Sequence, residues 1–443
     1  MKKQLIENVK NAGIVGAGGA GFPSHVKYDA SVHTVIANGA ECEPLLYCDQ
    51  YIMSRYAKEL VAGIKYVMQG TGATRGVIAL KEKYHTAVDA LLPIIKQENN
   101  IILHMLGNFY PAGDEQVIVH EVTGDVVPEG GIPLNVGVVV ANVSSLVNVS
   151  KSFSGENVTS RCLTVNGAVN SPFTAELPIG LTFAQLLNLA KGASVPDFTL
   201  ISGGPMMGKI ATLDDVVTKT TSAVLVLPSE HPHILRMTQN GNAILKRTKS
   251  SCDQCMACTE ICPRFLMGHN LKPHKIMRSI AYGISDTETT TSSFLCCDCG
   301  VCSFYACPLF LSPSKVNSYI KTALSAKGVK NPHRNKPENA RIFRTERLLP
   351  IPRLVSRIGL DSYAKQSAPF MDVEATSFAT VKIMLRQHIG SPAVPVVKMG
   401  QSVKNGQLIA DIPEAKLGAK IHASIDGTVA DITDNFIVIQ RQG

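Results

Sequence analysis

The chain has 443 residues, which exceeds what one hydrophobic core supports, so we expect three or four domains. Hydrophobic residues make up 45% and charged residues 18% of the sequence, a balance that excludes a disordered chain. The formal net charge of +8 comes without a Lys/Arg tract. The sequence therefore gives no indication of a nucleic-acid partner.

Neither a signal peptide nor a membrane span is expected. The first ten residues are charged and contain no apolar core. The most apolar stretch, residues 132–149, is interrupted by several Asn and Ser residues and is predicted to be a strand plus a turn. We therefore expect a cytoplasmic protein, in which 12 cysteines indicate metal binding more than disulfides.

Residues 1–155 are predicted to be α/β. An amphipathic helix with Leu5, Ile6 and Val9 leads into a glycine-rich loop, and a β-branched strand over 32–37 ends at Asn38-Gly39. Helical patterns over 51–69 and 87–97 enclose a short strand over 76–80. Because strands alternate with helices, we expect parallel pairing with helices on the sheet faces.

The rest of the chain divides into four segments. Residues 156–230 contain two strands around a helix at 182–191 and form a small α+β unit. Residues 231–330 carry the cysteine motifs between helices. Residues 331–375 are rich in Pro, Arg and Asn and are predicted to be a linker or extended arm, while residues 376–443 are short strands separated by turns.

Two cysteine runs carry the strongest signal in the sequence. "CDQCMACTEICP" and "CCDCGVCSFYACP" resemble the runs in which three thiolates bind one [4Fe–4S] cluster and the fourth binds the other. We define the first cysteine set as Cys252, Cys255, Cys258 and Cys307. The second cysteine set is Cys262, Cys296, Cys299 and Cys302. A pair of zinc sites is the alternative, and Cys297 is interpreted as a bystander.

The glycine loop admits two interpretations. Gly16, Gly18 and Gly21 fit G-x-G-x-x-G, and Glu41 follows 20 residues after Gly21, as in a dinucleotide-binding fingerprint. However, a helix is predicted before the loop where the fingerprint needs a strand, and Pro23 lies where the following helix should begin. A merely structural turn therefore remains open.

The segments "GAGGAGFP", "NGAECEP" and "YPAGDEQ" resemble, in this order, the FMN-binding 51 kDa subunit of respiratory complex I and, more closely, the C subunit of the Rnf electron-transport complex. Residues 156–230 are similar to the SLBB β-grasp domain of that family. Residues 376–443 are similar to its barrel-sandwich module, without a carrier lysine at the hairpin tip. The domain order and length resemble the cobalamin reductases of propanediol-utilisation microcompartments.

This resemblance implies a Rossmann-like domain over 1–155 that binds FMN and NADH. The glycine loop would approach phosphate, Phe22 would stack on a nucleotide ring, and Lys27 would pair with the FMN phosphate. The implied nucleotide-binding residues are Gly16, Gly18, Gly19, Gly21, Phe22, Lys27, Asn38, Glu41, Glu43, Tyr110, Gly113, Asp114, Glu115 and Asn142. Ala17 and Ala40 replace an Arg and an Asp of complex I, which predicts fewer polar anchors.

The implied activity is NADH-dependent oxidoreduction through FMN and two [4Fe–4S] clusters to a corrinoid, without a catalytic acid or base. A cobalamin adenosyltransferase and shell proteins would be further partners, within or at a microcompartment. One alternative is an Rnf-like electron-transfer protein that reduces ferredoxin or another redox partner. Another is a non-enzymatic electron carrier or shell-docking protein, which would bind no flavin.

Overall fold

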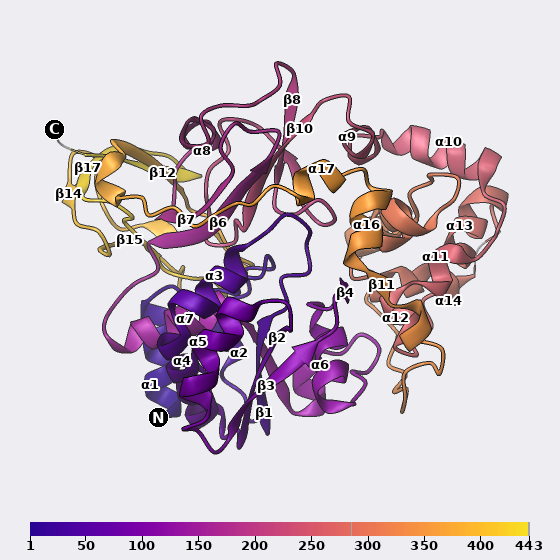
Figure 1. Ribbon diagram of the computed structural model, residues 1–443, viewed down its shortest axis with the longest axis horizontal. Coiled ribbons are helices and arrows are strands. Elements are labelled where there is room, and N and C mark those ends of the chain that lie inside the picture. Colours follow the sequence, from indigo (N-terminus) through magenta and orange to yellow (C-terminus); the bar gives the residue numbers. More distant parts are fainter. Residues whose placement is uncertain (285, 442–443) are drawn as a thin grey trace.

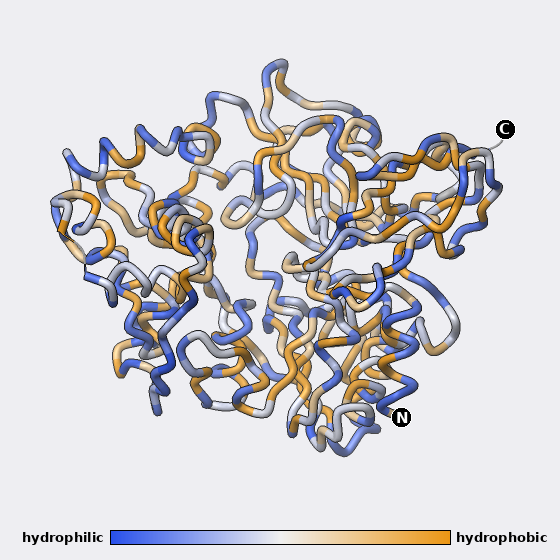
Figure 2. Tube along the Cα trace, turned by 180° about the vertical axis from the view of Figure 1, so that it is seen from behind, coloured by the Kyte–Doolittle hydropathy of each residue, from blue (hydrophilic) through white to orange (hydrophobic). Residues whose placement is uncertain are grey.

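The computed structural model describes residues 1–284 and 286–441. In Figure 1 the N-terminal unit lies below a central β unit, the C-terminal β module lies on the left and the cysteine-bearing helices lie on the right. One continuous apolar core joins the N-terminal, central and C-terminal units, whereas the cysteine-bearing helices enclose a core of their own. Figure 2 shows the strands of these units as the most apolar parts of the trace.

The N-terminal unit is built on a four-stranded sheet in the order β3-β2-β1-β5, with each neighbouring pair parallel. Alternate residues face opposite sides. Val35, Ile78 and Val139 join the core that contains α4 and α7, while Ile36 and Val77 face α6. The strands are β1 (Thr34–Gly39), β2 (Arg75–Lys81), β3 (Ile101–Leu106), β4 (Phe109–Tyr110) and β5 (Val138–Asn142). The helices are α1 (Lys2–Asn11), α2 (Ser24–Lys27), α3 (Cys48–Arg55), α4 (Ala57–Thr71), α5 (His85–Ile95), α6 (Glu115–Thr123), η1 (Pro133–Val136) and α7 (Val143–Phe153).

Part of the apolar stretch at 132–149 differs from expectation. The expected strand is β5, but α7 follows it directly where a turn was predicted. Asn142 caps α7 by accepting the Ser144 N–H, which satisfies a donor that the first turn of a helix leaves free. Leu146 and Val147 of α7 are buried. Their packing stabilises the helix although the segment contains several Ser and Asn residues.

The central unit is a mixed five-stranded sheet, ordered β7-β6-β10-β8-β9, with one helix. β6 and β10 are parallel, and the other pairs are antiparallel. Thr182 and Gln185 form a capping box at the start of the helix. The elements are β6 (Ser160–Gly167), β7 (Phe173–Pro178), α8 (Phe183–Leu189), β8 (Phe198–Ser202), β9 (Lys209–Ala211) and β10 (Ala223–Pro228).

The cysteine-bearing unit is helical, as expected, and its helices are short. Pro263 and Pro313 occupy the first turns of helices that begin after Cys262 and Ser312, where a missing N–H costs nothing. The elements are α9 (Pro232–Met237), α10 (Gly241–Ser251), α11 (Ala257–Glu260), α12 (Pro263–Leu266), α13 (Pro273–Tyr282), α14 (Thr287–Thr291), η2 (Ser292–Leu295), η3 (Cys302–Ala306) and α15 (Pro313–Ala326).

The segment 331–375 is an arm that also carries structure. Its β11 (Leu349–Pro350) pairs with β4 of the N-terminal unit, and Leu354 and Val355 of α16 (Ile351–Arg357) are buried. The remaining arm elements are η4 (Thr345–Arg347), α17 (Asp361–Ala364) and η5 (Ala375–Ser377). The arm therefore ties the cysteine-bearing unit to the N-terminal unit before the chain crosses to the C-terminal module (Figure 1).

The C-terminal module is all β, as predicted. Two sheets, ordered β12-β18-β17-β14 and β13-β15-β16, pair their strands antiparallel. Val381, Val429 and Ile437 contribute to the continuous core. The strands are β12 (Thr380–Met384), β13 (Val394–Pro395), β14 (Ser402–Val403), β15 (Leu408–Asp411), β16 (Ile421–His422), β17 (Gly427–Ile432) and β18 (Phe436–Gln440).

Candidate functional site

The carboxyl ends of β1 and β5 mark the point where the strand order of the N-terminal sheet reverses. From β1 the chain proceeds to β2 and β3 on one side and returns to β5 on the other. Ligands of open α/β sheets bind in the crevice at such a point. Asn38 at the end of β1 and Asn142 at the end of β5 are register partners there, so the fold brings together two residues that the sequence predicted.

The glycine loop reaches this edge of the sheet. A Cβ built on Gly18 would lie 3.7 Å from Asn142 Cβ, and one built on Gly19 would meet no atom within 4 Å. Gly19 and Gly21 have φ of +108° and +67°, which L side chains rarely adopt. The loop tip therefore leaves free space over the N-terminus of α7, and a group that carries phosphate fits such a place. Gly16 donates its N–H to the Phe22 carbonyl at 2.9 Å, which closes the loop, and Phe22 is half-buried.

Lys27 and Asn38 both connect to the neighbouring turn at residues 110–115. Lys27 Nζ donates to the Val140 carbonyl at 2.9 Å and pairs with Glu115 at 3.1 Å. Asn38 Nδ2 donates to the Gly113 carbonyl at 2.9 Å. The structure thus brings Lys27, Asn38, Gly113 and Glu115 together at one edge, with internal partners for their polar atoms. Their contact with a nucleotide stays a prediction.

A partly buried group of charged residues lies behind this edge and includes two, Asp49 and Lys81, that the sequence analysis missed. Glu41 accepts the Asp49 N–H at 2.9 Å, Asp49 accepts from Asn142 Nδ2 at 3.1 Å, and Lys81 Nζ donates to the Glu41 carbonyl. Burial and the neighbouring Asp49 raise the pKa of Glu41, and burial lowers the pKa of Lys81 to about 8. Lys81 could have been recognised in the sequence, because it ends the apolar run "GVIALK", which is typical of a buried parallel strand.

Glu43 and Tyr110 connect the carboxyl edge of the N-terminal sheet to the second cysteine set. Tyr110 Oη donates to the Cys299 carbonyl at 2.8 Å and lies 3.4 Å from Glu43 Oε1. Glu43 Oε2 accepts the Met206 N–H at 2.9 Å. Burial raises the pKa of Glu43 to about 7. Both predicted residues therefore border the second set as well as the sheet.

Asp114 forms a second connection. Its carboxylate caps α6 by accepting the Gln116 and Val117 N–H groups, and it pairs with both guanidinium nitrogens of Arg264 at 2.8 and 2.9 Å. Arg264 follows the Cys262-Pro263 pair. The sequence analysis did not identify Arg264, because nothing in its neighbourhood of the chain reveals a partner 150 residues away.

The first cysteine set comes together as the spacing predicts. Cys252, Cys255, Cys258 and Cys307 all line one cavity. Burial raises the pKa of Cys258 to about 12, and the thiolates of Cys307, Cys255 and Cys252 add to this effect. Cys307 belongs to the other run, so the cavity fits cross-ligation, in which a fourth cysteine comes from the opposite run.

The second cysteine set lies next to the first. Burial raises the pKa of Cys302, and the nearby thiolates of Cys296, Cys258 and Cys262 add to it, so cysteines of both sets lie near Cys302. Cys297 lies beside Cys299, whose side chain lowers the Cys297 pKa by a hydrogen bond. The bystander interpretation of Cys297 stays a prediction.

The donor chemistry fits iron–sulfur clusters. Within the described residues, no three or more His, Cys, Asp or Glu side chains converge to hold a single metal ion. The first cysteine set borders a cavity, with its four thiols from two runs. Soft thiolates spread around such a space suit a multi-iron cluster.

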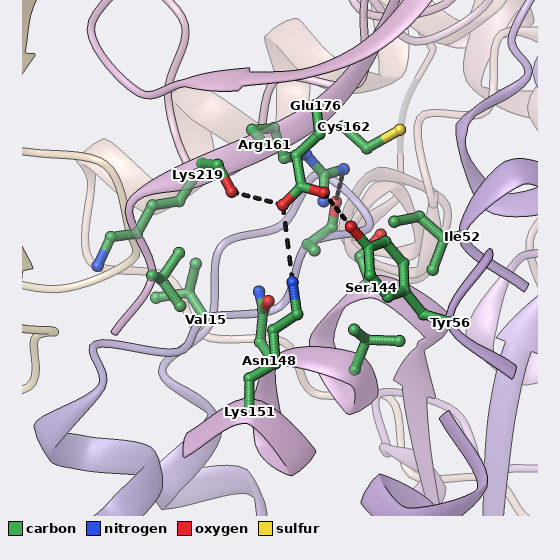
Figure 3. A pocket seen from close by; sticks show the side chains of 14 residues that line it. Val15, Ile52, Tyr56, Ser144, Asn148, Lys151, Arg161, Cys162, Glu176 and Lys219 are labelled. Carbon is green, nitrogen blue, oxygen red and sulfur yellow. Dashed lines mark hydrogen bonds and ion pairs between the residues drawn. The ribbon is translucent and has the colours of Figure 1, made fainter. Parts of the chain in front are cut away.

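The back of the glycine loop faces a pocket between the N-terminal and central units, with about 440 Å³ of space between atoms (Figure 3). Arg161 donates to the Ala17 carbonyl at 2.8 Å and to the Thr221 carbonyl at 2.9 Å. Figure 3 shows the Glu176 carboxylate facing Tyr56 and Lys151, with hydrogen-bond partners of its own. Arg161 therefore holds the loop from behind. Ala17, which replaces the Arg of complex I, is buried here.

Among the helices of residues 1–284 and 286–441, none has the combined length and apolar character that a bilayer crossing requires.

Three families match separate parts of the chain. The Nuo51 FMN-binding domain matches residues 9–151, the 4Fe-4S dicluster domain matches residues 251–312, and the RnfC barrel sandwich hybrid domain matches residues 363–442. The chain is therefore a multidomain α/β protein with FMN-binding, 4Fe-4S and barrel-sandwich domains. The barrel-sandwich match begins before the boundary at 376 that the sequence suggested.

Curated relatives match nearly the whole chain. It is 43% identical to the cobalamin reductase PduS of Citrobacter freundii, over 98% of this chain and 96% of that protein. It is 45% identical to the cobalamin reductase PduS of Salmonella typhimurium, over 99% and 96%. The C subunit of the Na(+)-translocating ferredoxin:NAD(+) oxidoreductase complex of Acetobacterium woodii is 36% identical over 59% of this chain and 58% of that protein. By its length-spanning identity and its domain order, the chain belongs to the cobalamin reductase PduS family.

Proposed function

We propose that this oxidoreductase passes electrons from NADH through FMN and two [4Fe–4S] clusters to a corrinoid. One observation carries the proposal: the cysteine-bearing unit contacts the carboxyl edge of the N-terminal sheet, where the nucleotide is proposed to bind, through two buried connections. Tyr110 bonds to the Cys299 carbonyl, and Asp114 pairs with Arg264. The predicted donor and acceptor regions, far apart in sequence, therefore share an interface.

Bound FMN would supply the change from two-electron to one-electron chemistry, and bound clusters would supply one-electron transfer. The chain itself would position these groups. The glycine loop and the N-terminus of α7 would receive the FMN phosphate, with Lys27 as its counter-charge. The partly buried group of Glu41, Asp49 and Lys81 would fix Asn142 and the end of β1 behind the flavin. No side chain needs to act as a catalytic acid or base.

The proposed order of the clusters follows from what each cysteine set touches. The second set adjoins Tyr110, Glu43 and Arg264, so a cluster there would receive electrons from the flavin. The first set contains Cys255, the exposed member of the eight proposed ligands, and would hold the cluster that meets the acceptor. Buried peptide groups around the sulfurs would tune both potentials.

The finer domain assignments belong to this proposal. Residues 1–155 would be a Rossmann-like FMN and NADH domain, supported by the parallel sheet and its reversal point. Residues 156–230 would be an SLBB β-grasp domain, supported by a mixed sheet with one helix. Residues 231–330 would bind both clusters, residues 331–375 would be the arm, and residues 376–443 would form the barrel-sandwich module.

The corrinoid acceptor is proposed from the name of the relatives, cobalamin reductase PduS. The same name supports a place within or at a propanediol-utilisation microcompartment, where shell proteins and a cobalamin adenosyltransferase would be partners. The similarity to the C subunit of a ferredoxin:NAD(+) oxidoreductase complex favours a second candidate, in which ferredoxin exchanges electrons with the clusters.

Anaerobic purification tests the proposal directly. We expect about eight irons per chain, matched by acid-labile sulfide, together with FMN released on denaturation. NADH should then bleach the cluster absorbance and drive corrinoid reduction. Turnover with ferredoxin and none with a corrinoid would support the second candidate. A preparation without flavin, or with zinc in place of iron, would contradict both.

A further inference from the structure

Three arginines from different helices meet beside the first cysteine set. We define the arginine patch as Arg236 of α9, Arg247 of α10 and Arg357 of α16. The guanidinium carbons of Arg236 and Arg357 lie 5.1 and 4.6 Å from the centroid of the Phe310 ring. Arg247 Nη2 donates to the Leu309 carbonyl at 3.4 Å. In Figure 1 these three helices belong to the lobe that carries the cysteine motifs.

The arginine patch adjoins a proposed ligand. Arg357 Nη2 donates to the carbonyl of Cys307 at 3.4 Å and Arg357 Nε to that of Tyr305 at 3.3 Å. Leu309 and Phe310, which follow Cys307, are 38% and 44% exposed. Exposed apolar side chains therefore surround the edge of the first set, and positive charges flank them.

The exposed guanidinium groups of Arg247 and Arg357 retain hydrogen-bonding capacity, whereas Arg236 is half-buried and donates to the Phe304 and Ser303 carbonyls. Within the part of the chain that the structure describes, ion pairs are formed by other residues, and none joins a member of the arginine patch to a carboxylate. Each guanidinium has five N–H donors, whereas exposed Arg247 and Arg357 use theirs on long bonds to main-chain carbonyls. A carboxylate from outside can bind such a guanidinium in a bidentate manner.

The charge of the whole unit supports the same partner chemistry. Residues 231–330 contain 12 Lys and Arg against 5 Asp and Glu, so this unit carries most of the formal net charge of +8. Asp253 is an acidic residue close to Cys255 within this positively charged unit, and its carboxylate accepts the Cys255 N–H at 3.2 Å. A positive face with an apolar centre complements an acidic protein surface.

We propose that the arginine patch and Phe310 form the docking site for an acidic protein that takes electrons from the first cysteine set. The inference rests on the proposed function, since it needs a cluster at that set. Each encounter would move one electron: the cluster is oxidised by one electron, the acceptor is reduced by one, and no bond is formed. A corrinoid would then be reduced while an acidic protein holds it.

A purely structural role is the competing explanation, in which the arginines only offset thiolate charge and hold the Cys307 loop. The two explanations predict different effects of salt concentration and of acceptor charge on the rate of electron transfer. Attraction between exposed charges weakens with ionic strength and changes the association rate by about tenfold or more. A structural role produces neither effect at equal cluster content.

The experiment uses the full chain with its clusters, reduced by dithionite so that NADH is not needed as the donor. Excess dithionite is removed by anaerobic gel filtration before the acceptor is added, because dithionite itself reduces cytochrome c. Cytochrome c, which is basic, and its succinylated, acidic form serve as two acceptors with the same haem. We expect the succinylated form to be reduced about tenfold faster at low salt than at about 0.5 M salt. R247Q/R357Q should lower its low-salt rate about tenfold and should not slow native cytochrome c.

The matched control is K327Q/K330Q, which removes two exposed charges of the same unit. Lys327 follows α15, whose 14 residues place it about 20 Å along the helix axis from Ser312. This variant should behave like the parent protein. Iron content and the low-temperature EPR signal confirm that the clusters are retained, and if the double variant loses iron, the single R247Q variant replaces it.

The results distinguish a failure of the proposed function from a failure of the docking-site proposal. If dithionite produces no reduced cluster signal, the proposed function itself is wrong. If the clusters reduce normally but the two cytochromes react alike at every salt concentration, or if R247Q/R357Q matches the parent protein, the docking site is wrong and the proposed function stands.

Discussion

Arg264 and Asp114 form a bidentate ion pair across the boundary between the cysteine-bearing unit and the N-terminal sheet. Both side chains are largely buried, with 10% and 12% of their surface exposed. Arg264 Nη1 also donates to Gln116 Oε1 at 2.7 Å. The residue that follows the Cys262-Pro263 turn is thereby fixed to the first turn of α6, so the position of the second cysteine set depends on this contact.

Replacing Arg264 with Met should destabilise the protein strongly. The change leaves the Asp114 carboxylate buried without its counter-charge, which costs about 3–5 kcal/mol in comparable buried pairs. Denaturant unfolding under anaerobic conditions measures the free energy of unfolding. The control is R347Q, because Arg347 and Glu260 are an exposed pair at 3.3 Å, for which about 0–1 kcal/mol is expected. Equal losses in the two variants would contradict the importance of the buried pair.

Glu43 should make the protein less stable as the pH rises. Burial raises its folded-state pKa to about 7, above the ordinary value near 4.5 that the unfolded chain has. Between these two values the folded state binds more protons, so the free energy of unfolding falls with increasing pH. Glu43→Gln keeps the shape and removes the titration. The difference between parent and variant, measured at about pH 4.5 and pH 7.5, should change by about 1–3 kcal/mol, and a constant difference would exclude this role.

Local patterns predicted much of this architecture. The alternation of β-branched strands and helices in residues 1–155 is borne out by the parallel sheet. Cysteine spacing predicted that Cys307 joins the first run, and the structure places Cys307 at the same cavity as Cys252. Both signals are short-range: a periodicity of two or 3.6 residues, or a fixed spacing, is visible within a dozen residues.

The residues that were missed depend on contacts between distant segments. The roles of Lys81 and Asp49 depend on the fold, because β1 and β2 end, and α3 begins, at the same edge. Arg236 of α9 and Arg357 of α16 contact the Phe310 ring from helices far apart in the sequence. α16 lies in the segment 331–375, which the sequence analysis predicted to be a linker or extended arm. α7 was missed for a local reason: Asn142 was not recognised as an N-cap, although Leu146 and Val147 continue the helical spacing.

Lys27 should contribute directly to flavin affinity. If its ammonium pairs with the FMN phosphate, Lys27→Met should weaken FMN binding by about tenfold or more, because a hydrogen bond to a charged group contributes about 1.5–3 kcal/mol. Fluorescence of released FMN on dilution of the purified protein measures the change. Lys65, in an exposed pair with Glu98 at 2.9 Å, provides the control variant K65M. An unchanged FMN affinity in K27M would place the phosphate elsewhere.

Cross-ligation predicts in which double cysteine variants the losses of iron add and in which they do not. Cys252 and Cys307 come from different runs but line the same cavity, so both would bind one cluster. C252S and C307S should each lower iron from about eight to about four per chain, and C252S/C307S should lower it no further. C252S/C296S should lose both clusters, while C297S should retain both if Cys297 is a bystander. Iron and sulfide analysis with EPR of the dithionite-reduced protein distinguishes these cases. If C252S/C307S loses all iron, as C252S/C296S does, each run binds its own cluster, and the electron route through Arg264 and Tyr110 needs a different assignment of ligands.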